Sequence, residues 1–134
     1  MKKRILVIDG SKAIRFLLQT VLGKKYQVNT APDGSSGMYQ VSQKNLPDLI
    51  IADAQLPDMD DWELITYLTS SCLYGHIPVA VLSSLPKKET QFKTRELGAR
   101  QFFIKPFNPV ELVNYVDALI LNSVLIEDAT LKFV

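Results

Sequence analysis

The chain has 134 residues, of which 47% are hydrophobic and 22% are charged, a composition that indicates one globular domain and excludes an intrinsically disordered protein. The formal net charge of +1 gives no electrostatic basis for binding nucleic acid or anionic membranes. The single cysteine, Cys72, excludes an internal disulfide, and the first apolar run is too short for a signal peptide or a membrane span, so we expect a cytoplasmic protein.

The first third of the chain predicts two strands and two helices. The continuous apolar run 5–8 is typical of a strand buried on both faces. Next comes a helix that begins after a cap at Ser11, ends at Gly23 and has one apolar stripe: Ile14, Leu17, Leu18, Val21 and Leu22. Segment 26–30 alternates between apolar and polar residues, which predicts an edge strand. Segment 35–42 predicts only a weak helix, because it contains a glycine and three serines.

The middle of the chain repeats this alternation. The apolar runs 49–52 and 79–82 each predict a buried strand. Between them, a helix beginning near Asp60 or Asp61 presents Leu64, Ile65 and Leu68. Segment 88–97 predicts a loosely held helix, because Phe92 and Leu97 are almost its only apolar residues.

The last predicted strand, 102–104, is again apolar, and we expect it to be buried on both faces. Asn108 followed by Pro109 and by Glu111 is a strong start signal for a final helix. Its buried stripe consists of Leu112, Val113, Val116, Leu119 and Ile120. Five strands alternating with five helices predict an α/β fold with a doubly wound open parallel sheet. We expect the domain to cover 1–123, and 124–134 to be a tail or the start of a linker.

Polar residues follow four of the apolar runs: Asp9, Asp53, Ser83 and Lys105. Each alone is consistent with an ordinary loop residue, but in doubly wound sheets ligands bind beyond the carboxyl ends of the strands. Two carboxylates suit Mg²⁺, and one of them could attack phosphorus to give an acyl phosphate. A hydroxyl and an ammonium could bind the remaining phosphoryl oxygens. The four residues together therefore favour a phosphoryl-transfer site.

The order and spacing of five segments resemble the receiver domain of two-component response regulators, over about residues 2–122. The matching segments are 5–9, 48–53, 56–60, 78–84 and 102–107. The resemblance implies a flavodoxin-like sheet with strand order 2-1-3-4-5. It also implies a switch rather than a turnover enzyme, one that assists its own phosphorylation and dephosphorylation. The phosphate would come from the phosphohistidine of a sensor histidine kinase or phosphotransfer protein.

The same resemblance implies roles for individual residues. Asp53 would be the phosphoacceptor, and Mg²⁺ would be held by Asp9, Asp53 and the backbone carbonyl of Gln55. Phosphate would draw Ser83 inward and admit the ring of Phe102, although ordinary core packing explains Phe102 equally well. An unidentified output partner would then read the face formed by 79–82, 88–97 and 102–104. The Lys105–Pro106 bond is expected to be cis.

Two positions depart from the family pattern. Gly10 stands where the family has a second acid after the first strand, so we expect weaker Mg²⁺ binding, by about an order of magnitude or more. Asp61 stands where the family has glycine, and it would either adopt a positive φ or cap the third helix. We expect none of Asp58, Asp61 and the Gln55 side chain to replace the missing acid directly.

The sequence is consistent with two functions: a phosphorylatable receiver with weakened metal binding, and a pseudo-receiver that binds proteins without cycling phosphate. An aspartyl phosphatase is disfavoured, because Gln55 stands where such enzymes need an acid. A flavin or dinucleotide fold is disfavoured by the lack of a glycine-rich loop after the first strand. We expect His76 to face solvent and Cys72 to pack at the end of the third helix.

Overall fold

The computed structural model describes residues 2–132, and the side chains of residues 2–123. Five parallel strands form one sheet in the order β2-β1-β3-β4-β5. The strands are β1 (Arg4–Ile8), β2 (Gln27–Ala31), β3 (Leu49–Asp53), β4 (Val79–Ser83) and β5 (Gln101–Ile104). This confirms the flavodoxin-like, doubly wound fold, including the strand order.

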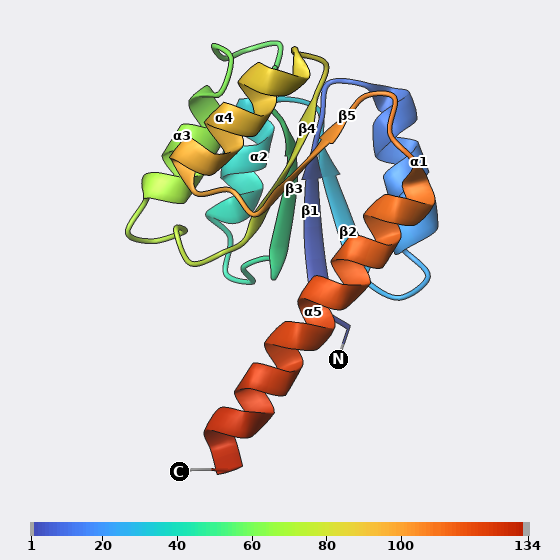
Figure 1. Cartoon of the computed structure of the whole chain (residues 1–134), viewed down its shortest axis with the longest axis vertical. Coiled ribbons are helices and arrows are strands. Elements are labelled where there is room, and N and C mark those ends of the chain that lie inside the picture. The colour runs from blue at the N-terminus through green and yellow to red at the C-terminus, as the bar shows by residue number, and fades with distance from the viewer. Residues whose placement is uncertain (1, 133–134) are drawn as a thin grey trace.

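Five helices cover the two faces of the sheet: α1 (Lys12–Leu22), α2 (Gly34–Val41), α3 (Glu63–Ser70), α4 (Lys87–Leu97) and α5 (Pro109–Lys132). In Figure 1, α1 and α5 lie on one side of the sheet, and α2, α3 and α4 lie on the other. Because all neighbouring strands pair in parallel, every strand of the sheet ends at the same edge.

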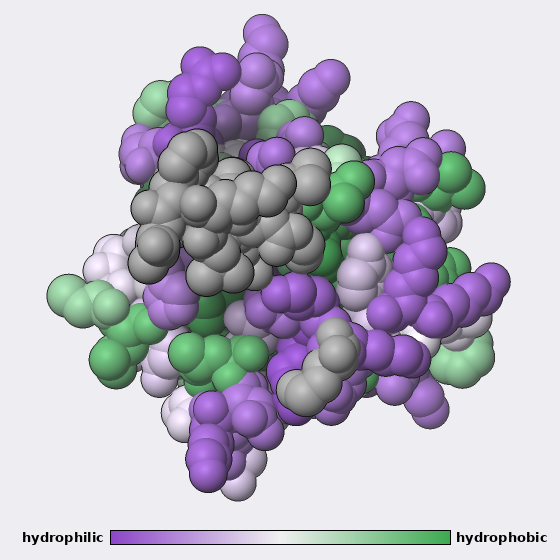
Figure 2. Space-filling view, turned by 90° about the horizontal axis from the view of Figure 1, so that it is seen from below, coloured by the Kyte–Doolittle hydropathy of each residue, from purple (hydrophilic) through white to green (hydrophobic). Residues whose placement is uncertain are grey.

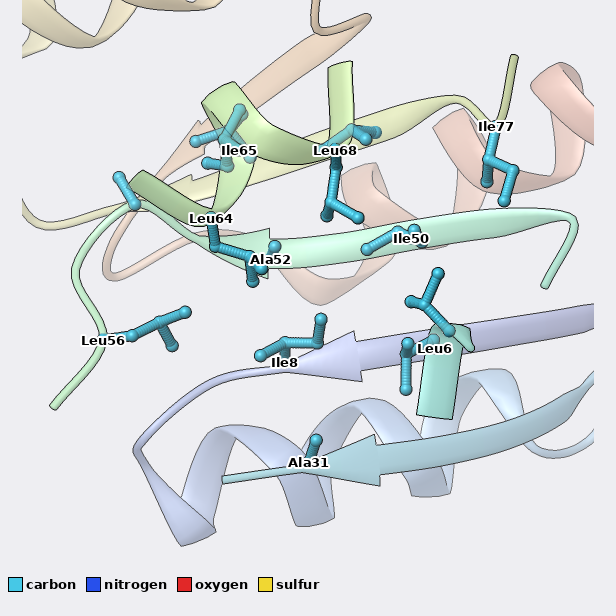
Figure 3. Close-up of a cluster of buried hydrophobic side chains, with 14 of the residues drawn as sticks. Leu6, Ile8, Ala31, Ile50, Ala52, Leu56, Leu64, Ile65, Leu68 and Ile77 are labelled. Carbon is cyan, nitrogen blue, oxygen red and sulfur yellow. The ribbon is translucent and has the colours of Figure 1, made fainter. Parts of the chain in front are cut away.

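The three central strands are almost completely buried, as their apolar sequences predict. Alternate residues enter two separate cores: Leu6 and Ile8 pack towards α2 and α3, whereas Ile5 and Val7 pack towards α1 and α5. Figure 3 shows the first core, where the labelled side chains of β1 and β3 meet Leu64, Ile65 and Leu68 of α3. Each fully buried leucine or isoleucine contributes about 2 kcal/mol, so these cores hold the strand ends in fixed register.

The two edge strands differ from the central ones. β2 alternates between exposed and half-buried residues before Ala31, which confirms the predicted edge strand. The prediction for β5 was wrong, because all four of its residues are half-buried. Its apolar sequence is typical of a central strand, but within the described residues β5 pairs with β4 alone, so its other edge has no neighbouring strand there.

Helix α2 forms despite its weak sequence, and its glycine explains why. A Cβ atom at Gly37 would lie only 2.6 Å from Cδ1 of Ile8. Glycine therefore allows α2 to approach β1 closely, and the packing this permits offsets the low helix propensity. The carboxylate of Asp33 also caps α2, accepting a hydrogen bond from the Ser36 N–H at 2.7 Å.

Helix α3 begins at Glu63, later than predicted, and neither proposed role of Asp61 is correct. Among the described non-glycine residues, only Trp62 has a positive φ, of 68°. The Trp62 N–H donates to the Ala54 carbonyl at 2.8 Å, and the Trp62 side chain is buried. The hydrogen bond and the buried ring therefore fix the left-handed backbone one residue after the position that sequence suggests.

The predicted ends of α1 and the predicted start of α5 are confirmed. Ser11 Oγ accepts from the Ile14 N–H at 3.3 Å, and α1 ends at Gly23. Asn108 Oδ1 accepts from the Val110 N–H at 2.9 Å, and Pro109 begins α5. In Figure 1, α5 continues well past the sheet. The proposed tail at 124–134 falls on residues whose side chains lie outside the described part, so the 1–123 boundary stays a prediction.

Figure 2 views the molecule from below, where the strands begin. Hydrophilic residues predominate outside the grey atoms, and the apolar areas in view are small and separate. A hollow of about 290 Å³ at this end is lined in part by Lys3, Asp48 and His76. His76 is exposed, as predicted, whereas Cys72 is also exposed and lies after α3 instead of packing at its end. Among the described helices, none has the length and apolarity to cross a membrane.

Candidate functional site

The four polar residues singled out from the sequence lie at the same edge of the sheet. Asp53 and Ser83 are the last residues of β3 and β4, and Asp9 and Lys105 come directly after β1 and β5. Parallel pairing of neighbouring strands fixes this common position. Asp9, Asp53 and Ser83 are buried, and the Lys105 side chain is 16% exposed.

Lys105 joins the two carboxylates. Its ammonium lies 2.7 Å from Oδ2 of Asp9 and 2.5 Å from Oδ2 of Asp53. The second oxygen of each carboxylate accepts a backbone N–H two residues further along, from Ser11 and Gln55, each at 2.8 Å. The cis Lys105–Pro106 bond is present, as the resemblance implied. Three of the four predicted residues therefore form one connected charged cluster.

The charges of this cluster affect one another. Burial raises the pKa of Asp53 above its ordinary value, although hydrogen bonds from Lys105 and the Gln55 N–H and the positive charge of Lys105 act in the opposite direction. The nearby charge of Asp9 raises it further. Burial acts to lower the pKa of Lys105, but its contacts with Asp53 and Asp9 outweigh burial and raise it. Lys105 therefore stays charged and balances one of the two carboxylates.

Ser83 lies at the site, but its hydroxyl is hydrogen-bonded to groups outside the charged cluster. Ser83 Oγ lies 2.8 Å from Oγ1 of Thr90 on α4 and accepts from the Leu85 N–H at 3.0 Å. In the described residues it has no hydrogen bond to Asp53 or Lys105. Thr90 was not predicted from the sequence; its only signal there is a threonine in a helix that has few apolar residues to bury.

The buried residues of α4 are polar. Phe92, one of the few apolar residues of this helix, is 63% exposed, and the buried residues are Thr90 and Thr94. Phe102 on β5 is half-buried and packs against the core on the α4 side of the sheet. Its position is compatible with both ordinary packing and movement, so the switch role stays a prediction.

One further residue that the sequence analysis missed supports the site from α1. The guanidinium of Arg15 donates to the backbone carbonyl of Asp9 at 2.7 Å. Arg15 lies one turn into α1, where its long side chain can reach back over the loop after β1. This contact helps to fix the backbone that carries the Asp9 carboxylate.

The donor set suits a hard divalent cation such as Mg²⁺, but it is short of carboxylates. Asp9 Oδ2 is buried, and within the described part of the chain its one polar partner is the ammonium of Lys105, at 2.7 Å. A buried carboxylate oxygen in this state is available to a cation that displaces the ammonium. No group of three or more His, Cys, Asp and Glu side chains among the described residues could hold a metal ion.

Two acids near the site, Asp58 and Asp61, are hydrogen-bonded to other groups. Asp58 accepts hydrogen bonds from the Gly34 and Ser35 N–H groups at 2.8 and 2.9 Å, and these bonds lower the pKa of Asp58. The Asp61 carboxylate lies 3.4 Å from the side-chain amide of Gln55. Both acids therefore have other partners, and the expectation that neither replaces the acid missing at Gly10 stays a prediction.

Comparison with known proteins gives a consistent result. Residues 5–117 match the family model of the response regulator receiver domain. The chain is 31% identical over 129 residues to the response regulator PleD of Caulobacter vibrioides, covering 96% of this chain and 28% of PleD. It is 33% identical over 110 residues to histidine kinase P4 of Formosa agariphila, covering 82% of this chain and 8% of that protein. The chain thus spans only a minor part of these two relatives.

A solved structure has the same fold. The chemotaxis response regulator CheY4 of Vibrio cholerae superposes with a TM-score of 0.76 and 28% sequence identity. The similarity covers 88% of this chain and 98% of the CheY4 chain. The described fold therefore corresponds to nearly the whole of that structure, with the remainder of this chain outside the match.

Proposed function

The chain belongs to the response regulator receiver domain family, and from this we propose that it is a phosphoryl-accepting switch of two-component signalling, modified on Asp53. The observation that carries the proposal is the environment of Asp53. This carboxylate is buried at the end of β3, and its two oxygens are held by the Lys105 ammonium and the Gln55 N–H. One oxygen is thereby oriented by a cation that can also bind an incoming phosphoryl group.

The proposed reaction is a phosphoryl transfer between two residues. A carboxylate oxygen of Asp53 attacks the phosphorus of a phosphohistidine on a sensor histidine kinase or phosphotransfer protein. The P–N bond breaks, an acyl phosphate forms on Asp53, and the electron pair of the broken bond stays on the histidine ring. The Lys105 ammonium neutralises charge on the phosphoryl oxygens. Hydrolysis of the acyl phosphate by water returns Asp53 and inorganic phosphate.

We propose that Asp9, Asp53 and the backbone carbonyl of Gln55 hold Mg²⁺. When bound, Mg²⁺ would supply positive charge that offsets repulsion between the carboxylates and the phosphoryl group. Gly10 contributes no carboxylate, so we propose that the affinity for Mg²⁺ is weaker than a third acid would provide.

The proposed switch then passes through Ser83 and Phe102. Phosphate on Asp53 would attract the Ser83 hydroxyl, and the ring of Phe102 would follow into the space that Ser83 leaves. The output surface would be the face formed by β4, α4 and β5. The exposed ring of Phe92 on α4 supports this assignment, because it offers a partner an apolar contact. We propose that this signalling takes place in the cytoplasm.

Phosphorylation of the whole chain tests the proposal directly. Incubation with acetyl phosphate and Mg²⁺ should add the mass of one phosphoryl group, and intact-mass spectrometry measures it. Asp53→Asn is the matched control, because it keeps the size of the side chain and removes the nucleophilic oxygen. Equal phosphate incorporation in both proteins, or none in either, would reject Asp53 as phosphoacceptor.

A second function, a pseudo-receiver that binds partners without cycling phosphate, is favoured by Gly10. It predicts no phosphate on the native chain at any Mg²⁺ concentration. Phosphorylation of Gly10→Asp but not of the native chain would support the pseudo-receiver. Phosphorylation of the native chain at high Mg²⁺ concentration would support the weakened receiver.

A further inference from the structure

Thr90 of α4 is hydrogen-bonded to Ser83 of β4. Among the described residues, this is the only side-chain hydrogen bond between α4 and the sheet. The two hydroxyl oxygens are 2.8 Å apart, and both residues are completely buried. Ser83 also accepts from the Leu85 N–H at the start of the loop that leads to α4. The Ser83 hydroxyl is therefore engaged on the α4 side of the site.

The buried face of α4 makes this hydrogen bond important. Its two buried residues, Thr90 and Thr94, both carry a hydroxyl and lie one turn apart, whereas Leu97 at the end of the helix is only partly buried against the core. Oγ1 of Thr94 is buried and has no hydrogen-bond partner in the part of the chain that the structure describes. The two threonines thus have the same side chain and similar burial, but among the described residues only Thr90 is hydrogen-bonded to a residue of the site.

We propose that Thr90 is a positioning residue that competes with a phosphoryl group on Asp53 for the hydroxyl of Ser83. This inference rests on the proposed function, since it assumes that Ser83 donates to a phosphoryl oxygen. When Ser83 turns to the phosphoryl group, the Thr90 hydroxyl is left buried without its partner. The Ser83 hydroxyl can therefore hold α4 through Thr90 or bind a phosphoryl group on Asp53, and this competition couples the site to the output face.

Replacement of Thr90 by valine should strengthen binding at Asp53. Without a phosphoryl group on Asp53, Thr90→Val deprives the Ser83 hydroxyl of one hydrogen-bond partner. With a phosphoryl group on Asp53, the substitution removes a buried threonine hydroxyl that would otherwise have no partner. Both effects favour the occupied state. From the net value of one hydrogen bond, the affinity for a phosphoryl mimic should rise about fivefold.

Beryllofluoride with Mg²⁺ is the probe, because it forms a tetrahedral, phosphate-like adduct with a carboxylate. Its dissociation constant is measured by fluorine NMR on the whole chain, for the native protein and for Thr90→Val, Thr90→Ser, Thr94→Val and Asp53→Asn. We expect about fivefold tighter binding for Thr90→Val, native affinity for Thr90→Ser, which keeps the hydroxyl, and native affinity for Thr94→Val. The same series is measured in a Gly10→Asp background, so that weak Mg²⁺ binding does not prevent detection of the differences in beryllofluoride affinity.

Hydrogen exchange of the α4 amides is a second readout. In the native protein, beryllofluoride should speed this exchange, and in Thr90→Val the exchange should be fast before the probe is added. Equal affinities for Thr90→Val and Thr94→Val, or a Thr90→Ser protein that behaves like Thr90→Val, would overturn the role of Thr90 alone. Binding that survives Asp53→Asn, or no binding in either background, would overturn the proposed function together with this inference.

Discussion

A Cβ atom on Gly10 would lie 3.4 Å from Cδ of Pro57, which is an ordinary van der Waals contact. The φ of Gly10 also lies outside the left-handed region. An aspartate is therefore sterically acceptable at position 10, beside Asp9. We expect Gly10→Asp to raise the affinity for Mg²⁺ by about tenfold or more, because it restores an anionic ligand. Isothermal titration calorimetry with MgCl₂ measures this change.

Gly10→Asn is the matched control for this prediction. It has the size and shape of aspartate but no charge, so we expect a much smaller gain in Mg²⁺ affinity. Without Mg²⁺, Gly10→Asp should lower the free energy of unfolding, because a third carboxylate repels Asp9 and Asp53. An equal effect of both substitutions on Mg²⁺ affinity would show that charge at position 10 is not what limits the site.

The close approach of α2 to β1 predicts a large effect of a small substitution. Gly37→Ala places a methyl group 2.6 Å from Cδ1 of buried Ile8, so the helix or the side chain has to move. We expect the free energy of unfolding to fall by about 1–3 kcal/mol, even though alanine is the better helix former. Urea denaturation measures it. Tyr39→Ala is the control on the same helix; Tyr39 is 68% exposed, and its substitution should change stability by no more than about 0.5 kcal/mol.

The strands and the site cluster could be predicted from sequence because both depend on local patterns. Apolar runs mark buried strands, and parallel strands bring the residues after them to one edge, so Asp9, Asp53 and Lys105 meet. The burial of β5, the direction of the Ser83 hydroxyl and its partner Thr90 depend on which elements become neighbours. A local sequence pattern does not show which elements become neighbours. Thr90, for example, cannot be distinguished by its local sequence from exposed threonines in other helices.

The backbone before α3 gives a prediction that contradicts the family pattern. Since the positive φ belongs to Trp62 and not to Asp61, glycine at position 61 should relieve no strain. We expect Asp61→Gly to lower the free energy of unfolding by about 0.5 kcal/mol, through its greater backbone entropy in the unfolded chain. Thermal denaturation of Asp61→Gly beside Asp61→Ala measures this. A glycine variant more stable than both the alanine variant and the native protein would place the strain at Asp61 after all.

A cluster far from the site predicts how stability depends on pH. The hydroxyl of Tyr26 donates to Asp117 on α5, and the ammonium of Lys25 lies 2.9 Å from the same carboxylate. The hydrogen bond from Tyr26, followed by that from Lys25, lowers the pKa of Asp117. Burial raises the pKa of Tyr26, so its hydroxyl remains a donor at neutral and acidic pH. This cluster ties the start of β2 to α5.

The sign of the pH effect follows from the lowered pKa of Asp117. A carboxylate that is more acidic in the folded protein stabilises it above the unfolded pKa, near 4, and this stabilisation is lost as the pH falls through the folded pKa. The Asp117 side chain is 30% exposed, so we expect Asp117→Asn to cost only about 1 kcal/mol at pH 7, and less at pH 3. Urea denaturation at both pH values measures the difference. Tyr26→Phe removes the main hydrogen-bond donor to Asp117. In that background, Asp117→Asn should cost less at pH 7 than it does in the native background, and about as much as in the native background at pH 3. A cost of Asp117→Asn that does not change between pH 7 and pH 3 in the native background would contradict this assignment.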